Sequence, residues 1–457
     1  MSHIPAPPGK QYTLYQLKGI RFALGGRGTL IADDMGLGKT IEAIGVINAM
    51  SAGRNDLNVV IICPAFLRLN WHNELDAWMV DSCNVSVISY YQADILARDI
   101  RINGKLAIDI LIVDEAQYIK NPESKRSKNV LEIAESAKKV IALSGTPMEN
   151  RPIELWPLLK MLCPEKWCVD NPRITTLVQE RRKSHPDEGP AFWEFAARYC
   201  ALKRVHRQSK NRTFSAWDFS GASNLSELNA RLKKTCMVRR LKKDVLMELP
   251  EKRRQLIVLE SKASDIDLFP NMHETNYEKI LNLLLVEKVQ FHEWSRRRHQ
   301  QALEKVDACI MFISDQLEQP GKLIVFAHHA DVIEKLKTGI DCEFHSSDEY
   351  SVTITGETPM KERQERVERF QTDPRCRVII GSIGAMGVGF TLTAADRVIF
   401  VELDPVPGRM TQAEDRAHRI GQENKVHVYH LVANGSLCAR MARIILKKQA
   451  VLSAALD

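Results

Sequence analysis

One string of the sequence has the residue types and spacing of a phosphate-binding loop. Residues 33–40 read Asp-Asp-Met-Gly-Leu-Gly-Lys-Thr and follow the apolar run GTLIADD at 28–34. Glycines let backbone N–H groups approach a phosphate, and a helix that begins behind them adds its positive end. Lys39 would pair with the β- and γ-phosphates, and the Thr40 hydroxyl would ligate Mg²⁺.

The general pattern GxxxxGK[ST] requires glycine at position 33, where this chain has Asp33. A turn-rich helix start is the alternative interpretation of the string alone. The predicted nucleotide-binding residues are Asp34, Met35, Gly36, Leu37, Gly38, Lys39 and Thr40.

A pair of carboxylates ends a second apolar run. Asp114 and Glu115 close the run DILIVDE at 109–115, 75 residues after Lys39. The carboxyl end of a strand in a parallel sheet is where ligands bind. Asp114 would orient Mg²⁺, and Glu115 would position or deprotonate an attacking water. A lone Asp-Glu pair is usually a solvated strand end, but the upstream loop favours a catalytic pair.

A third candidate group lies in the second half of the chain. Gln412, Arg416 and Arg419 stand at i, i+4 and i+7, which places them on one face of a predicted helix. Two arginines on one face can stabilise the charge on a transferring phosphoryl group. Without the loop, the same string would indicate an exposed, salt-bridged helix.

Ten short β-branched runs must position these groups. Near-continuous apolar runs are typical of strands buried on both faces, and alternation with helical segments indicates doubly wound parallel sheets. Five runs in each half of the chain predict two α/β lobes in tandem. The runs are 28–34, 59–64, 85–90, 109–115, 138–147, 322–329, 350–356, 376–382, 397–404 and 425–433.

The region from about Pro152 to Pro320 has a different character, helical and highly charged, with a lobe boundary near Leu249 and Pro250. Between Arg173 and Arg254 there are 20 Lys and Arg against 9 Asp and Glu, in a chain whose net charge is +7. A clustered basic region is the electrostatic footprint of nucleic-acid binding. A solvated helical surface is the alternative.

Composition excludes several classes of protein. With 457 residues and 44% hydrophobic content, the chain is neither disordered nor short of core, and no apolar run reaches membrane-span length. The ten cysteines form no CxxC pair, so we expect reduced thiols and no thiolate metal site. The first residues lack a signal-peptide layout. We therefore expect a cytoplasmic protein, or a nuclear one if the source is eukaryotic.

The chain resembles the Swi/Snf-type branch of the superfamily-two helicases, in which an Asp at position 33 is usual. The matching strings occur in the family's order over nearly the whole chain. They are TLYQLKGI, ADDMGLGKT, IICPAFLRLNW, VDEAQYIKN, LSGTPMENRP, VFAHH, GAMGVGFTLTAAD and QAEDRAHRIGQ. WDFSGASNLSELN, VRRLKKDVLMELPEKRR and ELDPVPG are similar to the HARP-type annealing-helicase subfamily.

This resemblance implies two tandem RecA-like lobes with helical insertions. Lobe 1 would span residues 1–250, with an ATP-binding core at about 12–165 and a helical basic insertion at about 166–250. Lobe 2 would span 251–457, with a helical protrusion at about 261–318 and the helicase C-terminal core at about 319–457. We expect this core without the accessory domains of the subfamily's larger members.

The resemblance also assigns roles to residues. Gln16 would read adenine, and Arg416 and Arg419 would reach the nucleotide from lobe 2 as arginine fingers, with Gln412 beside them. The expected coupling and DNA-track residues are Pro64, Ser144, Gly145, Thr146, Pro147, His328 and Ser382. Two departures bear on coupling: Gln117 replaces the usual His, and Pro405 replaces a common Trp.

The sequence thus predicts an ATP hydrolase that uses ATP and Mg²⁺ to move on duplex or forked DNA as a monomer, with strand annealing or fork remodelling as the finer expectation. Contacts to DNA should be mostly to phosphates. Alternatives are an RNA-dependent helicase, an ATP-gated DNA clamp that does not travel, and an adaptor with a vestigial ATPase. Lys39, Glu115 and Arg419 are all present, which argues against the adaptor.

Overall fold

The computed structural model divides into two compact units. The first comprises Met1–Val245 and Ala450–Asp457, and the second comprises Leu246–Gln449. The structure describes residues 4–54, 56–104, 106–167, 190–209, 212–245, 250–259, 288–344, 350–387, 389–419, 421–433, 441–442, 445, 448 and 455–456.

A six-stranded, all-parallel sheet forms the centre of the first unit, in the order β3-β2-β4-β5-β1-β8. Its strands are β1 (Gly28–Ile31), β2 (Asn58–Cys63), β3 (Asn84–Ser89), β4 (Ile108–Asp114), β5 (Ala137–Leu143) and β8 (Met237–Val238). The principal helices around it are α1 (Leu14–Leu24), α2 (Lys39–Ser51), α3 (Arg68–Trp78), α4 (Ala93–Asn103), α5 (Lys125–Glu135) and α6 (Trp156–Leu162).

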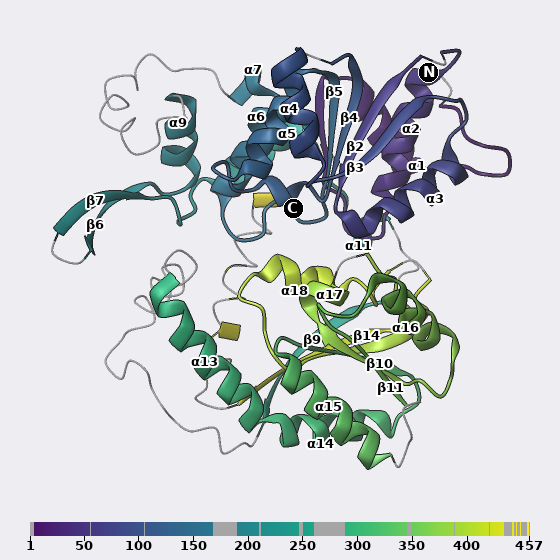
Figure 1. Cartoon of the computed structure of the whole chain (residues 1–457), viewed down its shortest axis with the longest axis vertical. Coiled ribbons are helices and arrows are strands. Elements are labelled where there is room, and N and C mark those ends of the chain that lie inside the picture. Colours follow the sequence, from purple (N-terminus) through teal and green to yellow (C-terminus); the bar gives the residue numbers. More distant parts are fainter. Residues whose placement is uncertain are drawn as a thin grey trace. The chain divides into compact units, whose positions relative to one another are not determined.

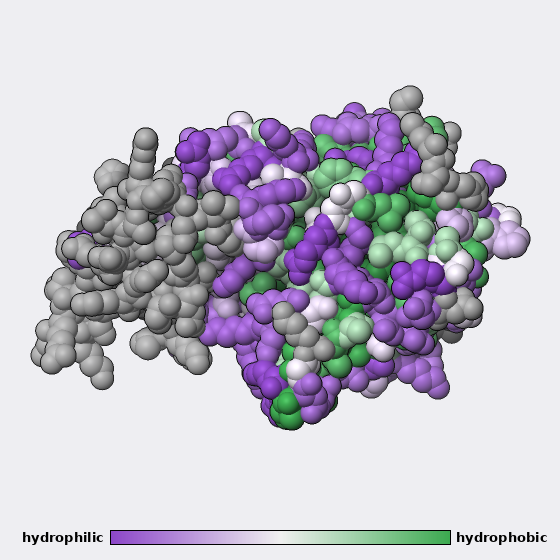
Figure 2. Space-filling model, turned by 90° about the horizontal axis from the view of Figure 1, so that it is seen from above, coloured by the Kyte–Doolittle hydropathy of each residue, from purple (hydrophilic) through white to green (hydrophobic). Residues whose placement is uncertain are grey.

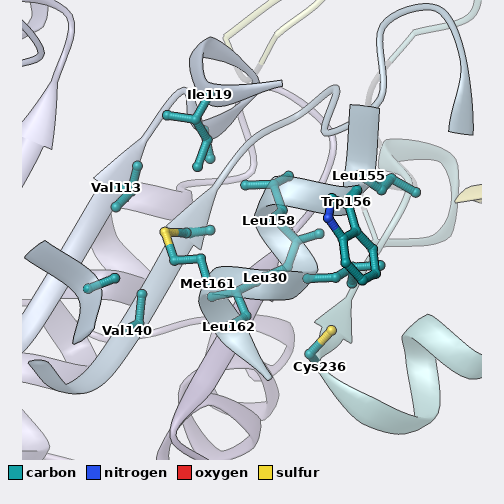
Figure 3. Close-up of a cluster of buried hydrophobic side chains, with 14 of the residues drawn as sticks. Leu30, Val113, Ile119, Val140, Leu155, Trp156, Leu158, Met161, Leu162 and Cys236 are labelled. Atoms are coloured by element: carbon teal, nitrogen blue, oxygen red, sulfur yellow. The ribbon is translucent and has the colours of Figure 1, made fainter. Parts of the chain in front are cut away.

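Helices cover both faces of this sheet. Successive residues of a strand point to opposite faces, so the apolar strand residues are buried on both sides. Helices α4, α5 and α6 lie over one face, and α1, α2 and α3 lie over the other (Figure 1). Figure 3 shows Leu158 and Met161 of α6 facing Leu30, Val113 and Val140 of the sheet. All five are buried, so the strand ends that follow them are held on a rigid support.

Further elements of the first unit follow α6. They are α7 (Pro164–Trp167), α9 (Pro190–Tyr199), β6 (Lys203–Ser209), β7 (Arg212–Asp218), α10 (Leu225–Thr235) and α11 (Lys242–Val245). Ala455 and Leu456 also pack in this unit's core, and Asn229 donates a hydrogen bond to the Ala455 carbonyl at 3.2 Å. The end of the chain therefore belongs to the first unit, whereas the sequence placed all of 319–457 in the second lobe.

The second unit repeats the architecture around a six-stranded parallel sheet, in the order β11-β12-β10-β13-β14-β9. Its strands are β9 (Lys252–Leu259), β10 (Lys322–Ala327), β11 (Ser351–Ile354), β12 (Val378–Ser382), β13 (Ala395–Phe400) and β14 (Val426–Ala433). Its helices are α13 (Lys288–Glu304), α14 (Val306–Leu317), α15 (Ala330–Glu343), α16 (Met360–Thr372), α17 (Ile383–Met386) and α18 (Pro407–Glu414).

The fold-class prediction is confirmed, since each unit is a doubly wound parallel α/β sheet. All ten predicted strands are present, five in each unit. Figure 2 shows that polar side chains cover most of the described surface on one face, with smaller apolar areas between them. Within the described residues, the structure has no helix long and apolar enough to cross a membrane.

The helical expectation for 166–250 is wrong at β6 and β7, which form an antiparallel hairpin. High charge suggested a solvated helix, but charge does not set secondary structure. Val205, Phe214 and Trp217 are residue types that favour strands. The Trp217 ring packs edge-on against Trp193 of α9, with ring centroids 6.0 Å apart, and this tertiary contact outweighs the local pattern.

Two further strands, β8 and β9, do not coincide with any of the ten apolar runs. β8 has only two residues, Met237 and Val238, and it pairs with Leu30 and Ile31 of β1 at the sheet edge. β9 begins with Lys252 and two arginines, and it pairs along its whole length with β14. Two residues are too few to show a period, and charged residues are common on edge strands, so apolar periodicity could detect neither β8 nor β9.

Candidate active site

The predicted phosphate loop leaves β1 at the carboxyl edge of the first unit's sheet. Gly36 and Gly38 have φ angles of 86° and 83°, a left-handed conformation that glycine adopts without steric cost. Gly38 immediately precedes α2, whose thirteen residues begin at Lys39. The helix start presents unpaired N–H groups and partial positive charge next to the glycines. These are the backbone features that phosphate binding requires.

The side chain of Lys39 is held inside this loop. Its Nζ donates to the backbone carbonyls of Asp33 and Asp34, at 2.8 and 3.2 Å. Burial lowers the pKa of Lys39, and the nearby carboxylates of Glu115, Asp33 and Asp114 oppose that shift. The ammonium group therefore lies among acceptors that a phosphate oxygen can replace.

Strand β5 brings a third segment to the loop. It lies between β1 and β4 in the sheet, and Leu143 pairs with both Ile31 and Asp114. A β-carbon at Gly145 would lie 2.6 Å from Met35 Cγ and 3.3 Å from Lys39 Nζ. Glycine is therefore required for the close approach of residues 144–147, of which Pro147 is buried, to the phosphate loop.

Asp114 and Glu115 end β4 in a fixed geometry. Asp114 Oδ2 accepts from Trp71 Nε1 at 2.8 Å, and its Oδ1 accepts from the Glu115 amide at 2.8 Å. Glu115 has a φ of 49°, which is uncommon for a residue with a side chain and recurs at functional sites. The Tyr90 hydroxyl donates to the backbone carbonyls of Asp114 and Glu115, at 2.8 and 3.3 Å, and so stabilises the turn that these two residues form.

The donor set fits a magnesium ion. Burial, and then the adjacent Glu115 carboxylate, raise the pKa of Asp114 to about 7. A divalent cation would offset both effects, because it neutralises the charge that burial disfavours. Thr40, at the start of α2, is partly exposed, and its hydroxyl, like the carboxylate, is an oxygen ligand of the kind Mg²⁺ prefers.

Gln117 connects the carboxylates to the segment after β5. Its Nε2 donates to Glu115 Oε2 at 2.7 Å, and its Oε1 accepts from Ser144 Oγ at 2.6 Å. Ser144 Oγ in turn accepts from the Thr146 amide at 3.1 Å. A continuous hydrogen-bonded path thus runs from Glu115 to Thr146, and the side chain that departs from the family pattern forms its central link.

We predict that Gln117→Leu lowers turnover about 10-fold to 100-fold, because Glu115 loses the donor that orients its carboxylate. Gln117→His is the matched control, since imidazole can both donate and accept and should retain most of the activity. Steady-state ATP hydrolysis of both variants at saturating ATP tests this. Equal activity of the leucine variant and the wild type would show that the path has no role in turnover.

Gln16 lies against the end of the phosphate loop. It is buried, its Oε1 accepts from the Thr13 amide at 3.0 Å, and its Nε2 donates to the Leu37 carbonyl at 3.3 Å. A β-carbon at Gly38 would lie 2.6 Å from Gln16 Nε2. The structure therefore brings Gln16 to the phosphate loop, and its role in reading adenine stays a prediction.

Arg240 is a residue of this site that the sequence did not reveal. Its backbone N–H and its Nε each donate to Asp33 Oδ1 at 2.9 Å, so it pairs with the residue that departs from the general loop pattern. The signals that could have found it are Asp33, which follows an apolar run and needs a cationic partner if it is buried, and the basic string VRRLKKDV at 238–245.

In the second unit, both predicted arginine fingers contact the loop that precedes β13. Arg416 is 6% exposed, and it donates to the carbonyls of Gly387 and Phe390 at 3.0 and 3.3 Å. Arg419 is half-buried and donates to Thr391 Oγ1 at 3.2 Å. Arg419 is therefore the more accessible of the two guanidinium groups.

The prediction that Gln412, Arg416 and Arg419 lie on one face of a helix is wrong, because α18 ends at Glu414. Gln412 lies in α18 and is buried, whereas Arg416 and Arg419 lie in the turns that follow. The Arg416 amide bonds to the Ala413 carbonyl, and the Arg416 carbonyl accepts from Leu392 at 2.9 Å. This long-range bond takes an acceptor that the helix would need, so spacing alone could not locate the end of the helix.

The predicted DNA-track residues lie at the carboxyl ends of strands in their own units. Pro64 follows β2, and His328 follows β10. The His328 amide donates to Glu402 Oε2 at 2.7 Å. Ser382 ends β12 and caps α17, and its register partner is Ala327 of β10. Their contacts with DNA stay predictions.

Part of the predicted basic surface lies outside the described residues, namely Arg181, Arg182 and Lys183, and the side chain of Arg207 does as well. Lys203 and Arg204 begin β6 and are exposed. Lys203 Nζ lies 3.6 Å from the Asp218 carboxylate across the hairpin. Arg204 adds a second cation, so these three side chains carry a net positive charge.

Two family models match the chain. A model of the SNF2-related domain matches residues 15–94 and 82–306, and a model of the helicase conserved C-terminal domain matches residues 303–421. A solved structure, the Sulfolobus solfataricus SWI2/SNF2 ATPase core in complex with dsDNA, aligns with 97% of this chain and 92% of that chain, at 23% identity and a TM-score of 0.42. A likeness at this level supports no inference about ligands.

Curated relatives match over nearly the whole chain. The Xenopus tropicalis SWI/SNF-related matrix-associated actin-dependent regulator of chromatin subfamily A-like protein 1 is 31% identical, with 100% of this chain and 46% of that protein covered. The Bos taurus DNA annealing helicase and endonuclease ZRANB3 is 33% identical, with 97% of this chain and 40% of that protein covered. The chain thus spans less than half the length of these relatives. The resemblance drawn from the motifs is confirmed: the chain belongs to the SNF2-related family, and a helicase conserved C-terminal domain forms much of its second unit.

Proposed function

We propose that this chain is an ATP hydrolase that uses the energy of ATP to move along duplex or forked DNA. The observation that carries the proposal is the convergence of Lys39, Glu115 and Ser144 from three neighbouring strand ends, with Gln117 linking two of them. A phosphate loop, a carboxylate pair and a coupling segment are the parts that nucleotide hydrolysis needs.

Each residue of the proposed site has a separate task. Lys39 exchanges its bonds to the loop carbonyls for bonds to the phosphates. Glu115 orients the attacking water and accepts its proton, and Gln117 holds the carboxylate in place. Arg419 supplies positive charge to the γ-phosphoryl oxygens from the second unit. Thr40 and Asp114 would hold Mg²⁺, which neutralises phosphate charge when bound.

Two observations support DNA as the polymer that this chain engages. The segment from Arg173 to Arg254 holds an excess of 11 positive charges in a chain of net charge +7, as expected for contacts to phosphates. One relative is named a DNA annealing helicase. Strand annealing and remodelling of forked DNA are therefore the finer activities that we propose. We propose that a monomer carries them out, in the cytoplasm or, in a eukaryote, in the nucleus.

The test is the rate of ATP hydrolysis with Mg²⁺ across a panel of single-stranded, duplex and forked DNA and duplex RNA at matched concentrations. Duplex or forked DNA should raise turnover well above the rate without nucleic acid. An equal or larger response to RNA would replace the DNA assignment by an RNA-dependent helicase. A-form RNA differs in groove width and carries a 2′-OH, so the panel separates the two.

We predict that charge reversal in the basic segment weakens DNA binding in a salt-dependent way. The positions are Arg181, Arg182, Lys183, Lys203, Arg204 and Arg207. For each phosphate that the variant no longer neutralises, the log–log salt slope should fall by about 0.9 for duplex DNA. Lys361→Glu is the control, because Lys361 is exposed on α16 outside this segment. An unchanged slope in the six-residue variant would make the segment a solvated surface.

A further inference from the structure

The chain passes between the two units at two places, and the first lies between Val245 and Leu246. On one side of it, β8 and the residues after it belong to the first unit. On the other side, Pro250 and β9 belong to the second unit. Only eleven residues separate Arg240 from Lys252 in sequence, and both residues are anchored by buried charges.

The first anchor is built on the phosphate loop. Arg240 pairs with the carboxylate of Asp33, its Nη2 lies 2.6 Å from Glu42 Oε2, and its Nη1 donates to the Tyr15 carbonyl. Both carboxylates are fully buried. A β-carbon at Gly19 would overlap the Glu42 carboxylate and approach Arg240, so the backbone of α1 is also fitted closely around this cluster.

The backbone around Arg240 holds the same loop. The Asp34 amide donates to the Arg240 carbonyl at 3.0 Å, and the Lys242 amide donates to Asp34 Oδ2 at 3.0 Å. Arg239 Nη1 donates to the carbonyls of Ala32 and Gly145, at 2.7 and 3.3 Å. Residues 239–242 therefore hold the entry to the phosphate loop and the segment after β5 together.

Burial explains why the cluster is specific for arginine. Burial and the neighbouring Asp33 carboxylate raise the pKa of Glu42 to about 9, against the opposing charge of Arg240. A single guanidinium with a fork of donors can satisfy Asp33, Glu42 and a carbonyl at once, whereas lysine has one point charge. Removal of the arginine would leave buried carboxyl groups without their cation.

The second anchor is built on the turn that carries the predicted arginine fingers. Lys252 Nζ lies 3.0 Å from Glu414 Oε2 and 2.9 Å from Asp415 Oδ1. Arg254 binds both oxygens of Glu414 through its Nε, at 2.9 and 3.0 Å, and donates from Nη2 at 2.6 Å. Burial alone would raise the pKa of Glu414, but Lys252 and the other cations hold that pKa well below its ordinary value.

A third contact completes this anchor. His418 Nε2 lies 2.7 Å from the Pro250 carbonyl, so residues 414, 415 and 418 all contact the chain as it enters the second unit. Arg416 lies between these contacts, and Arg419 follows directly. The residues that begin the second unit therefore contact the turn on both sides of Arg416.

We propose that residues 237–242 and 250–254 position both halves of the proposed ATP site: Arg240 fixes the phosphate loop, and Lys252 with Arg254 fixes the Arg416–Arg419 turn. The second half of this inference rests on the proposed function, because the role of Arg416 and Arg419 in ATP hydrolysis is part of that proposal. The three residues are positioning residues, because they act through the loop and the turn.

The first half is tested by nucleotide affinity, which needs no turnover. Arg240→Gln combined with Glu42→Gln removes the arginine and one of its two buried carboxyl partners, which leaves fewer buried groups without a partner and favours folding. We expect the double variant to keep the melting temperature of the single Glu42→Gln variant within a few degrees and to bind a fluorescent ATP analogue about 10-fold to 100-fold more weakly. Lys243→Ala is the control, because Lys243 is exposed in the same segment.

The second half is tested with Arg254→Met. Turnover at saturating ATP and DNA should fall about 10-fold to 100-fold, while ATP affinity changes less than twofold. Arg375→Met is the matched control, because Arg375 is exposed in the same unit, lies outside the basic segment and pairs with Asp373 at 3.2 Å. Hydrogen exchange at residues 415–419 should accelerate in Arg254→Met and not in Arg375→Met.

The outcomes separate this inference from the proposed function. A wild-type chain that binds ATP without DNA-stimulated turnover would refute the proposed function, and affinity and hydrogen exchange would still decide the inference. Unchanged nucleotide affinity in the folded Arg240 variant would overturn the first half. Unchanged exchange and turnover in Arg254→Met would overturn the second. If all variants lost affinity and turnover equally and also had lower melting temperatures, both anchors would only stabilise the fold, and the inference would be overturned.

Discussion

Arg419→Ala should nearly abolish DNA-stimulated ATP hydrolysis while ATP affinity falls much less. The carboxylates and the phosphate loop belong to the first unit, whereas Arg419 belongs to the second and is the more accessible of its two candidate fingers. In related nucleotide hydrolases an arginine finger contributes roughly 10³ to 10⁵ in rate, which is about 4 to 7 kcal/mol of barrier. Turnover and ATP dissociation constants of the variant give the comparison.

Two control variants isolate the guanidinium. Arg419→Lys keeps a positive charge but lacks the planar fork of donors, so it should restore little of the rate. Thr391→Val removes the hydroxyl that accepts from Arg419 at 3.2 Å without removing charge, and it should cost far less than the alanine variant. Arg416→Ala should also lower turnover. Wild-type turnover in Arg419→Ala would exclude the finger assignment.

Glu115→Gln should bind ATP with nearly wild-type affinity and lose hydrolysis by about 10² to 10⁴, the usual contribution of a general base. The substitution keeps the size of the side chain, and an amide oxygen can still accept from Gln117 Nε2, which lies 2.7 Å from Glu115 Oε2. The amide cannot accept the proton of the attacking water. Single-turnover hydrolysis and nucleotide binding measure the two effects separately.

The control for this variant is Glu123→Gln, since Glu123 is exposed and lies 3.6 Å from Lys128. It should behave as the wild type in both assays. Hydrolysis by Glu115→Gln at the wild-type rate would show that another group activates the water. Loss of ATP binding would instead point to a structural role for the carboxylate at its left-handed position.

The sequence predicted the sheets, and the places of the predicted phosphate loop and the carboxylate pair at their strand ends, because these signals are local. A buried parallel strand needs a continuous apolar run, and all ten such runs are strands in the structure. The two glycines at 36 and 38 require a positive φ, and the carboxylates stand where β4 ends. In each case the chemistry and the position are encoded within a few residues.

The features that the sequence did not predict depend on distant contacts. The hairpin of β6 and β7 is supported by Trp217 against Trp193, and α18 ends where the Arg416 carbonyl bonds to Leu392. Arg240 lies 207 residues from Asp33, so no local pattern links them. The available signal was an Asp where the general loop pattern has glycine, and it does not show which residue supplies the cation that this Asp needs.

The most direct test of an ATP-driven motor on duplex DNA is displacement of a third strand from a triplex. The wild-type chain should displace the strand with ATP and Mg²⁺, and neither Glu115→Gln nor the wild type without ATP should do so. Displacement at the same rate without hydrolysis, or DNA-stimulated hydrolysis with no displacement, would contradict movement and leave an ATP-gated clamp.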